Sequence, residues 1–274
     1  MLSADRYGNG PPVLLLHGQP GSRADWRRVI PLLESDHTLL VPDRPGYGTT
    51  GGRAGGFAAN ARDAVDLLDD RGIPSAVFVG YSWSGGVALA AAANHPERVA
   101  GLVLVASVRP GGSLGFGDRA LAVPLVGEAV GLLTLGAAGR VLRISQVQNM
   151  VDRRLPRSAR EAVRVLAGAT GASSGARVWR SFAAEQRYLA KELGSLAESL
   201  AHIRVPTVVV AGGADHVVPA SAGARLAASI PGADFRLIPG AHHLLPFDHP
   251  SEIAGAVRSV SGVGSAGTGP APGA

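Results

Sequence analysis

Short apolar runs recur along the chain and alternate with longer segments of helical period. Runs without polar alternation are typical of strands that are covered on both faces of a sheet. Strands that alternate with helices predict an α/β fold with a mostly parallel central sheet. The strand candidates are residues 13–16, 38–41, 76–79, 102–105, 207–210 and 234–238.

Helices are predicted between these strands. Within residues 58–71, Ala61, Val65 and Leu68 fall on one face and charged residues fall on another, and Gly72 follows as a helix-ending residue. Similar patterns predict helices over residues 84–94, 221–229 and 251–260.

The alternation stops between Arg109 and about Arg204, where helix-like segments occur without convincing strands. We therefore expect a helical insertion over residues 109–203 between two parts of one core, residues 1–108 and 204–261. Length alone does not decide between one large core and a core with an insertion.

Two stretches outside the core pattern have unusual composition. Residues 120–138 are nearly uncharged, but Pro124, Glu128 and three glycines make them a poor membrane span, which needs about 20 apolar residues. A lid over an apolar cleft, or core packing, is the favoured interpretation. Residues 262–274 contain only Gly, Val, Ser, Ala, Thr and Pro, which predicts a disordered tail.

Composition and charge narrow the function classes. The absence of cysteine excludes disulfides, thiolate metal sites and thiol catalysis. The first nine residues have no apolar run of signal-peptide length, so a cytoplasmic location is expected. Residues 109–204 hold 14 basic and 7 acidic side chains. This excess could attract anionic substrates, nucleic acid or a membrane surface, but without a nucleic-acid motif we favour solvated helix faces and expect neither of the last two partners.

The segment from Val77 to Gly86 is an apolar strand that runs into an alanine-rich helix. A serine at such a junction lies on a sharp turn that exposes its hydroxyl, in the pattern Gly-x-Ser-x-Gly. Both Ser82 and Ser84 are candidates, because Gly80 precedes the first and Gly86 follows the second. The position of the strand end favours Ser82. Two helix-capping serines at a plain turn are the structural alternative.

A second strand ends in a loop of small residues, His17 to Ser22. An acyl-transfer enzyme needs backbone N–H groups preset where negative charge develops on the carbonyl oxygen. The N–H groups of Gln19 and Trp83 are the candidates. The side chain of Gln19 either faces the same pocket or is a surface amide.

An acid and a histidine follow the last two predicted strands. Asp215 lies just past a strand end, where open α/β sheets build their sites, and it can orient a histidine. The adjacent His242 and His243 follow the next strand, and only one of them can face a serine. A metal site formed by these histidines with Asp248 and His249 lacks a familiar ligand spacing. We expect solvated or capping roles for His37, His95 and His202.

Together these segments resemble the α/β-hydrolase superfamily from Val13 to about Val260. The order Ser, Asp, His along the chain is the order of that fold. Residues 42–48 are similar to its Asp-x-Pro-Gly-x-Gly loop, and residues 95–99 are similar to its His-Pro-Glu-Arg-Val segment.

The resemblance implies a role for each site residue. Ser82 is the expected nucleophile, Asp215 the acid and His243 the base, with Gln19 and Trp83 as oxyanion donors. The insertion corresponds to the family's cap, and no metal or organic cofactor is implied. Substrate contacts are expected from His17, Gly18, Tyr81 and Leu244.

The sequence departs from the family pattern at three places. Ser84 and His242 stand where glycine is usual, which could narrow the pocket or alter activity. Only 16 residues precede His17, so one strand of the usual front hairpin is expected to be absent or to lie upstream.

A serine at the elbow predicts acyl transfer, because dehalogenases and epoxide hydrolases of this fold resemble it closely but use aspartate there. We expect an esterase that acts on a small molecule. Residues 132–135 favour a hydrophobic acyl group, and the cap arginines would suit an anionic one. Lactonase, C–C hydrolase and perhydrolase (haloperoxidase-like) activities stay open on the same triad, as do a ligand-binding role without turnover and the oligomeric state.

Overall fold

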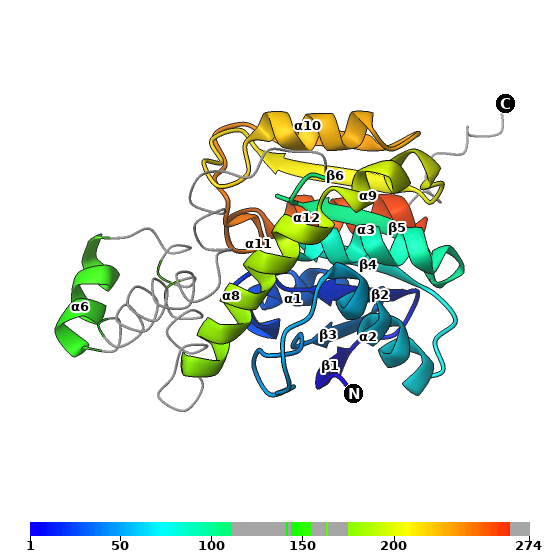
Figure 1. Ribbon diagram of the computed structural model, residues 1–274. Helices are drawn as coiled ribbons and strands as arrows, with labels where there is room; N and C mark the ends of the chain where they lie inside the picture. The colour runs from blue at the N-terminus through cyan, green and yellow to red at the C-terminus, as the bar shows by residue number, and fades with distance from the viewer. Residues whose placement is uncertain (111–140, 142–143, 155–159, 161–162, 164–174, 264–274) are drawn as a thin grey trace, which may run out of the picture.

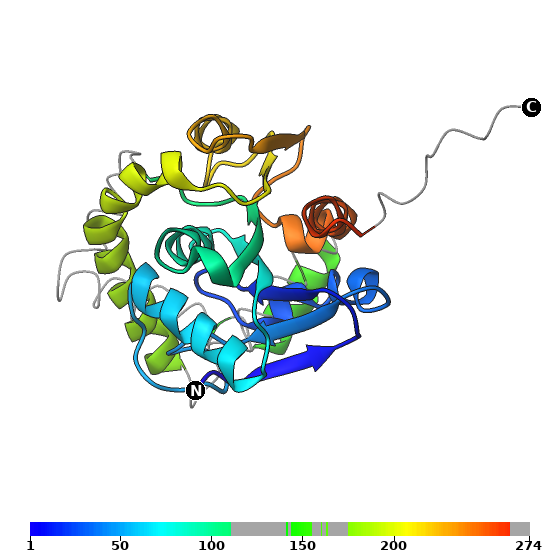
Figure 2. The ribbon, with the colours of Figure 1, turned by 90° about the vertical axis from the view of Figure 1, so that its right-hand side faces the viewer.

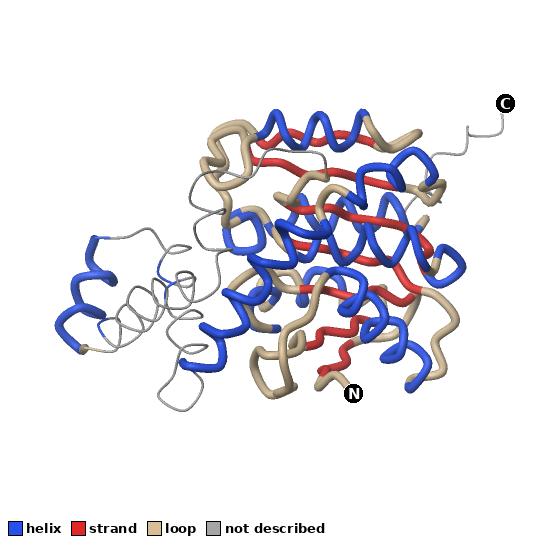
Figure 3. Tube along the Cα trace, viewed as in Figure 1, coloured by secondary structure: helices blue, strands red, loops and turns tan. Residues whose placement is uncertain are grey.

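The computed structural model describes residues 1–110, 141, 144–154, 160, 163 and 175–263. A seven-stranded sheet forms its centre, and its strands lie side by side in the order β1-β3-β2-β4-β5-β6-β7 (Figure 3). All six predicted strands are confirmed. The strands are β1 (Ala4–Tyr7), β2 (Pro12–Leu16), β3 (Thr38–Pro42), β4 (Ala76–Tyr81), β5 (Val99–Val105), β6 (Thr207–Gly212) and β7 (Asp234–Ile238).

The two edge strands differ from the expectation. β1 pairs antiparallel with β3, whereas all other pairs are parallel. Its sequence, ADRY, has no apolar run, which is why the hydrophobic pattern missed it. β7 is partly exposed along its length, so the expectation that every strand is covered on both faces is wrong at this edge.

Helices cover both faces of the sheet (Figures 1 and 2). All four predicted helices of the core are confirmed within one residue at each end. One core cluster packs α2, α3, α9 and α10 on one face, and a second packs α1 and α12 on the other. The helices are α1 (Ile30–Leu33), α2 (Phe57–Asp70), α3 (Ser84–Asn94), α9 (Ser195–Ser199), α10 (Ala220–Ala228), α11 (Leu245–Asp248) and α12 (Pro250–Ser261), with short 3₁₀ turns at Arg23–Trp26, Pro96–Arg98 and Leu200–His202.

The described part of the predicted insertion is helical. It contains α6 (Ser145–Arg154) and α8 (Gly175–Glu192), and no strand occurs among its described residues. The stretches 120–138 and 132–135 and nearly all of the predicted tail lie outside the described residues. Within the described chain, no helix combines the length and apolarity needed to cross a bilayer.

The strand order creates one crevice at the carboxyl ends of the strands. The chain steps from β2 to β3 on one side and then returns to β4 on the other side of β2. At such a reversal the following loops diverge, and this is where open α/β sheets bind ligands. The loops after β2 and β4 therefore meet at the crevice, together with those after β6 and β7.

Candidate active site

The turn after β4 holds Ser82 in a strained backbone conformation. Its φ is +55°, in the left-handed region that non-glycine residues rarely adopt. A Cβ on Gly80 would lie 2.5 Å from the carbonyl oxygen of Ser84, so only glycine fits before the turn. The strain and the close approach are those expected of a serine lifted out of the sheet at a strand-to-helix junction.

Three of the predicted residues form one hydrogen-bonded series. Ser82 Oγ lies 3.1 Å from His243 Nε2, and His243 Nδ1 lies 2.8 Å from Asp215 Oδ2. Since the carboxylate accepts at Nδ1, the neutral ring carries its proton there, and Nε2 is free to accept from the hydroxyl. The loops after β4, β6 and β7 thus bring together residues that are up to 161 positions apart.

Asp215 is held as a carboxylate. Its Oδ1 accepts hydrogen bonds from the backbone N–H groups of Val217 and Val218, at 2.8 and 2.9 Å. Burial raises the pKa of this carboxyl, but the hydrogen bond and charge of His243, with the two backbone donors, outweigh burial and leave the pKa lower than usual. An ionised Asp215 is able to stabilise an imidazolium at His243.

Tyr81 supports the histidine loop. Its hydroxyl donates to the carbonyl oxygen of His243 at 3.2 Å, and the two rings lie 5.5 Å apart. Burial, and then the charges of Asp25 and Asp215, raise the pKa of Tyr81 well above its usual value, so the phenol stays protonated as the donor. With its ring buried and its hydroxyl bound to backbone, Tyr81 holds His243 in place; the expectation of a substrate contact from it is not supported by this geometry.

Ser84 and His242, which stand at the two positions where glycine is usual, have different surroundings. Ser84 is fully buried at the first turn of α3, and its hydroxyl donates to the carbonyl oxygen of His17. It therefore joins the elbow to the end of β2 and does not face His243. His242 is exposed, and its Nδ1 lies 2.9 Å from the carbonyl oxygen of Ala214. Only the second of the two adjacent histidines reaches the serine.

The loop after β2 lies beside Ser82. A Cβ on Gly18 would come within 3.6 Å of Ser82 Cβ, which shows how closely this loop passes. The backbone N–H groups of Gln19 and Trp83 donate no hydrogen bond to any residue in the described part of the chain. Free N–H groups at this position can receive an oxyanion. The side chain of Gln19 instead donates to the carbonyl oxygen of Phe182 on α8, at 3.0 Å.

His17 differs from the expectation. It is completely buried; its Nδ1–H donates to the carbonyl oxygen of Gly18, and its Nε2 accepts from the backbone N–H of Arg44. Burial, and then the charge of Arg44, lower the pKa of His17 to about 3, so the ring is neutral. Because both nitrogens are engaged within the protein, His17 shapes the loop and is not placed to contact substrate. Leu244 is half-buried, and its predicted substrate contact stays a prediction.

Sequence reasoning missed a buried ion pair behind the site. Arg44 and Glu185 of α8 are both almost fully buried and form a salt bridge, and Tyr47 Oη donates to Glu185 Oε2 at 2.6 Å. Arg44 also donates to the carbonyl oxygens of His17 and Gly18. The guanidinium thus ties α8 to the loop that contains Gln19. The Asp-x-Pro-Gly-x-Gly segment marked Arg44 in the sequence, but no pattern marked Glu185.

Three further histidines, His37, His95 and His202, are expected from the sequence to be solvated or capping, and their outcomes differ. His37, expected to be solvated or capping, is fully buried between Asp36 and Ser261, with ring nitrogens at 2.8 and 2.9 Å from their side-chain oxygens. His95 caps α3 and His202 ends a 3₁₀ turn, as expected. Among the described residues, no three acidic or histidine side chains cluster so that they could hold a metal ion.

Known proteins resemble the chain over most of its length. The magnesium-chelatase 30 kDa subunit of Rhodobacter capsulatus is 29% identical over 252 residues, which cover 85% of this chain and 81% of the relative. A 2-hydroxy-6-oxononadienedioate/2-hydroxy-6-oxononatrienedioate hydrolase of Klebsiella pneumoniae is 29% identical over 249 residues, covering 86% and 82%. A solved esterase from Thermogutta terrifontis has a TM-score of 0.73 at 25% identity, covering 94% of this chain and 92% of that one.

The profile of the alpha/beta hydrolase family matches residues 13–256, nearly the whole described core and the insertion between its two parts. The fold agrees with this match, since a mostly parallel sheet with helices on both faces carries the site at its carboxyl edge. The chain belongs to the alpha/beta hydrolase family.

Proposed function

We propose that the chain is a serine hydrolase that cleaves a carboxylic ester or a related acyl bond. The observation that carries the proposal is the hydrogen-bonded series from Ser82 through His243 to Asp215. A hydroxyl, an imidazole and a carboxylate linked in this way let the serine lose its proton as it attacks a carbonyl carbon.

In the first half of the reaction, His243 Nε2 takes the proton of Ser82 while Oγ bonds to the carbonyl carbon. The carbonyl oxygen becomes negative, and the N–H groups of Gln19 and Trp83 donate hydrogen bonds to it. The tetrahedral intermediate then expels the alcohol, which receives the proton from His243. Asp215 stabilises the imidazolium while it exists.

In the second half, His243 takes a proton from water, and the water oxygen attacks the acyl carbon. A second tetrahedral intermediate forms on the same oxyanion donors. Its collapse releases the carboxylic acid, and Ser82 recovers its proton from His243. Every proton that moves is held by Ser82, His243, the alcohol or water, so the reaction needs no cofactor.

The substrate is a small molecule bound between the site and the insertion, residues 109–203, which acts as a cap. α8 supports this placement because it contacts the loops after β2 and β3 through Glu185 and Phe182. The apolar stretch 132–135 favours a hydrophobic acyl group. A carbon–carbon bond next to a carbonyl is the second candidate, favoured by the similarity to the Klebsiella hydrolase, whose name specifies a ketodicarboxylate. A perhydrolase reaction would use the same acyl-enzyme.

The test is labelling with a fluorophosphonate, followed by mass spectrometry of the modified peptide. We expect an adduct on Ser82 and turnover of short or medium p-nitrophenyl esters, with Ser84→Ala labelled and Ser82→Ala unlabelled. An adduct on Ser84 would refute the proposed nucleophile. Neither label nor turnover would favour a ligand-binding protein on this fold.

A further inference from the structure

α8 and the loop after β3 border a groove of about 740 Å³. The loop contributes residues 52–54, and α8 contributes one face with positions spaced at three and four residues. We call this the arginine groove. Its residues are Gly52, Arg53, Ala54, Arg177, Arg180, Ser181, Ala184, Arg187 and Tyr188.

No acidic residue lies among the described residues that line the arginine groove. Four of these nine residues are arginines; Arg187 interacts with a further group, so the arginines available to a ligand are Arg53, Arg177 and Arg180. The acids of α8 contact other groups, since Glu185 pairs with Arg44 and Glu192 Oε2 accepts from the backbone N–H of Phe57 at 2.7 Å. Like charges gathered on one wall repel one another unless an anion lies between them.

Several guanidinium donors that line the groove have no acceptor within the described chain. Arg177 donates from Nη2 to the carbonyl oxygen of Gly48 at 2.8 Å, but its Nε is buried without a hydrogen-bond partner. The side chains of Arg53 and Arg180 are exposed, and they form no hydrogen bond or ion pair with a described residue, so their donors are open to a ligand. The buried Nε of Arg177 costs stability because it has no acceptor, and a bound oxyanion would remove that cost.

We propose that the arginine groove binds a small molecule that carries at least two adjacent anionic groups, phosphate or carboxylate. Guanidinium groups recognise such oxygens through paired N–H donors, and Tyr188 adds an aromatic wall and a hydroxyl. None of the nine lining residues belongs to the Ser82 series or to the loop of His17 and Gln19. The groove is therefore built from residues other than those proposed to carry hydrolysis at Ser82.

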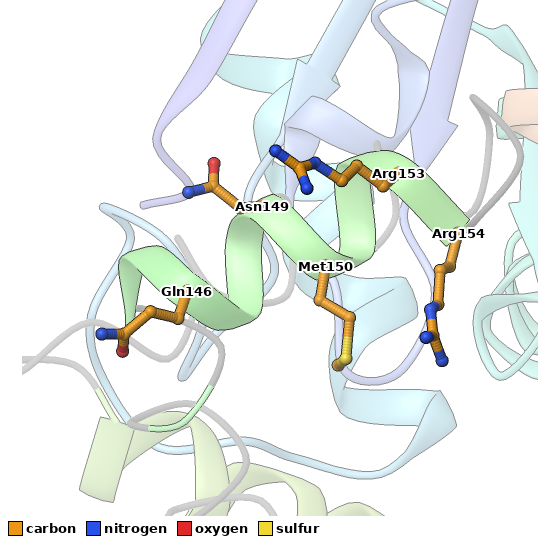
Figure 4. A pocket seen from close by; sticks show the side chains of 5 residues that line it. All are labelled: Gln146, Asn149, Met150, Arg153 and Arg154. Carbon is orange, nitrogen blue, oxygen red and sulfur yellow. The ribbon is translucent and has the colours of Figure 1, made fainter.

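A second hollow, of about 370 Å³, lies on α6 and makes a useful contrast. It also has two arginines, Arg153 and Arg154, but Figure 4 shows their side chains directed to different sides of the helix. All five of its described lining residues come from this one helix. The arginine groove differs because Arg53 faces the helix from another segment of the chain.

The test is calorimetric titration of the full chain with sodium pyrophosphate and, separately, sodium citrate, at an ionic strength fixed with NaCl. The groove variant carries Arg53→Gln and Arg180→Gln. The control variant carries Arg71→Gln and Arg225→Gln, which remove the same charge from exposed positions just after α2 and on α10. Thermal unfolding midpoints close to that of the parent verify that both variants are folded.

The proposal expects the parent to bind at least one probe, the groove variant to bind it about tenfold more weakly or worse, and the control to stay within about twofold. Binding of pyrophosphate alone would assign the groove to phosphates, and binding of citrate alone would assign it to carboxylates. The proposal is overturned if the parent binds neither probe. It is also overturned if the two variants lose affinity equally, because that result reflects net charge and not the groove.

Discussion

The elbow at Ser82 and the inner face of α8 both border the serine site, but they depend on contacts of very different range. At the elbow, Gly80 and Ser84 lie within two positions of Ser82 and fix its turn. On α8, Glu185 pairs with Arg44, which is 141 positions away. One region is set by a short motif and the other by contacts with distant segments, among them a buried ion pair.

The two regions should therefore fail differently when they are mutated. The elbow presents the reacting hydroxyl, so a change there should remove chemistry and leave the fold intact. The ion pair joins α8 to the carbonyls of His17 and Gly18, so a change there should cost stability and disturb the oxyanion loop. Four predictions test this separation.

Removing the nucleophile should have the largest effect. Ser82→Ala should lower kcat for ester hydrolysis by up to about 10⁶-fold, because no other group on the described site can form the acyl-enzyme. Steady-state kinetics with a p-nitrophenyl ester, with thermal unfolding measured in parallel, checks both halves of the prediction. Ser84→Ala is the matched control, and its kcat should stay within a few-fold of the parent. A Ser82→Ala enzyme that keeps half the parent kcat would remove Ser82 from the mechanism.

Changing the orienting acid should have the next largest effect. In Asp215→Asn the amide would donate toward His243 Nδ1, which favours the tautomer with the proton on Nε2, so the ring could not accept from Ser82. We expect kcat to fall by about 10⁴-fold while KM changes little. Asp248→Asn, an exposed carboxylate near the same loop, is the control. A loss in kcat of less than tenfold would show that the pairing at 2.8 Å is not used in catalysis.

The sequence predicted the elbow at Ser82 better than it predicted the contacts of α8. The elbow depends on residues that are neighbours in the sequence, whereas α8 contacts residues far away in the sequence. Ser82, Asp215 and His243 each follow an apolar strand, and parallel strands bring their carboxyl ends to one edge of a sheet. The pattern therefore predicted that these three residues come together, as their hydrogen bonds show, and it predicted six of the seven strands. Glu185 carries no such signal, because an acidic residue on an amphipathic helix is predicted to lie on the surface unless its buried partner is known. β1 was missed because its sequence, ADRY, is polar at an edge.

Breaking the ion pair should cost stability first. Glu185→Gln leaves the Arg44 guanidinium buried without a counter-charge, which should lower the free energy of unfolding by about 3–5 kcal/mol. Urea unfolding checks this, with the exposed Glu198→Gln as control. If Arg44 positions the oxyanion loop, the folded variant should also lose kcat more than it raises KM. Unchanged stability would mean that the pair is not the link between α8 and the loop.

A smaller effect, on the pH dependence of stability, distinguishes the two buried acids at the site, Asp25 and Asp215. Asp25 Oδ2 accepts from the backbone N–H of Gly18, yet burial raises its pKa to about 7, whereas the pKa of Asp215 is lowered. Between about pH 4 and pH 7 the folded state keeps the Asp25 proton that the unfolded chain has lost, so stability falls as pH rises through this window. A shift of this size corresponds to up to about 4 kcal/mol.

The amide side chain that Asp25→Asn introduces cannot ionise. The free energy of unfolding of this variant should therefore not decline between about pH 4 and pH 7, whatever that free energy is at low pH. Urea unfolding of both proteins at pH 4.5, 6 and 7.5 measures the difference in slope, and parallel curves would show that Asp25 ionises normally. If the free energy of unfolding declines more steeply with pH in the parent than in the variant, the loop with Gln19 is held best when Asp25 is protonated. The contributions of Asp25 and Asp215 to stability would then change with pH in opposite directions, because the lowered pKa of Asp215 makes its contribution present only above the pH range in which it is protonated.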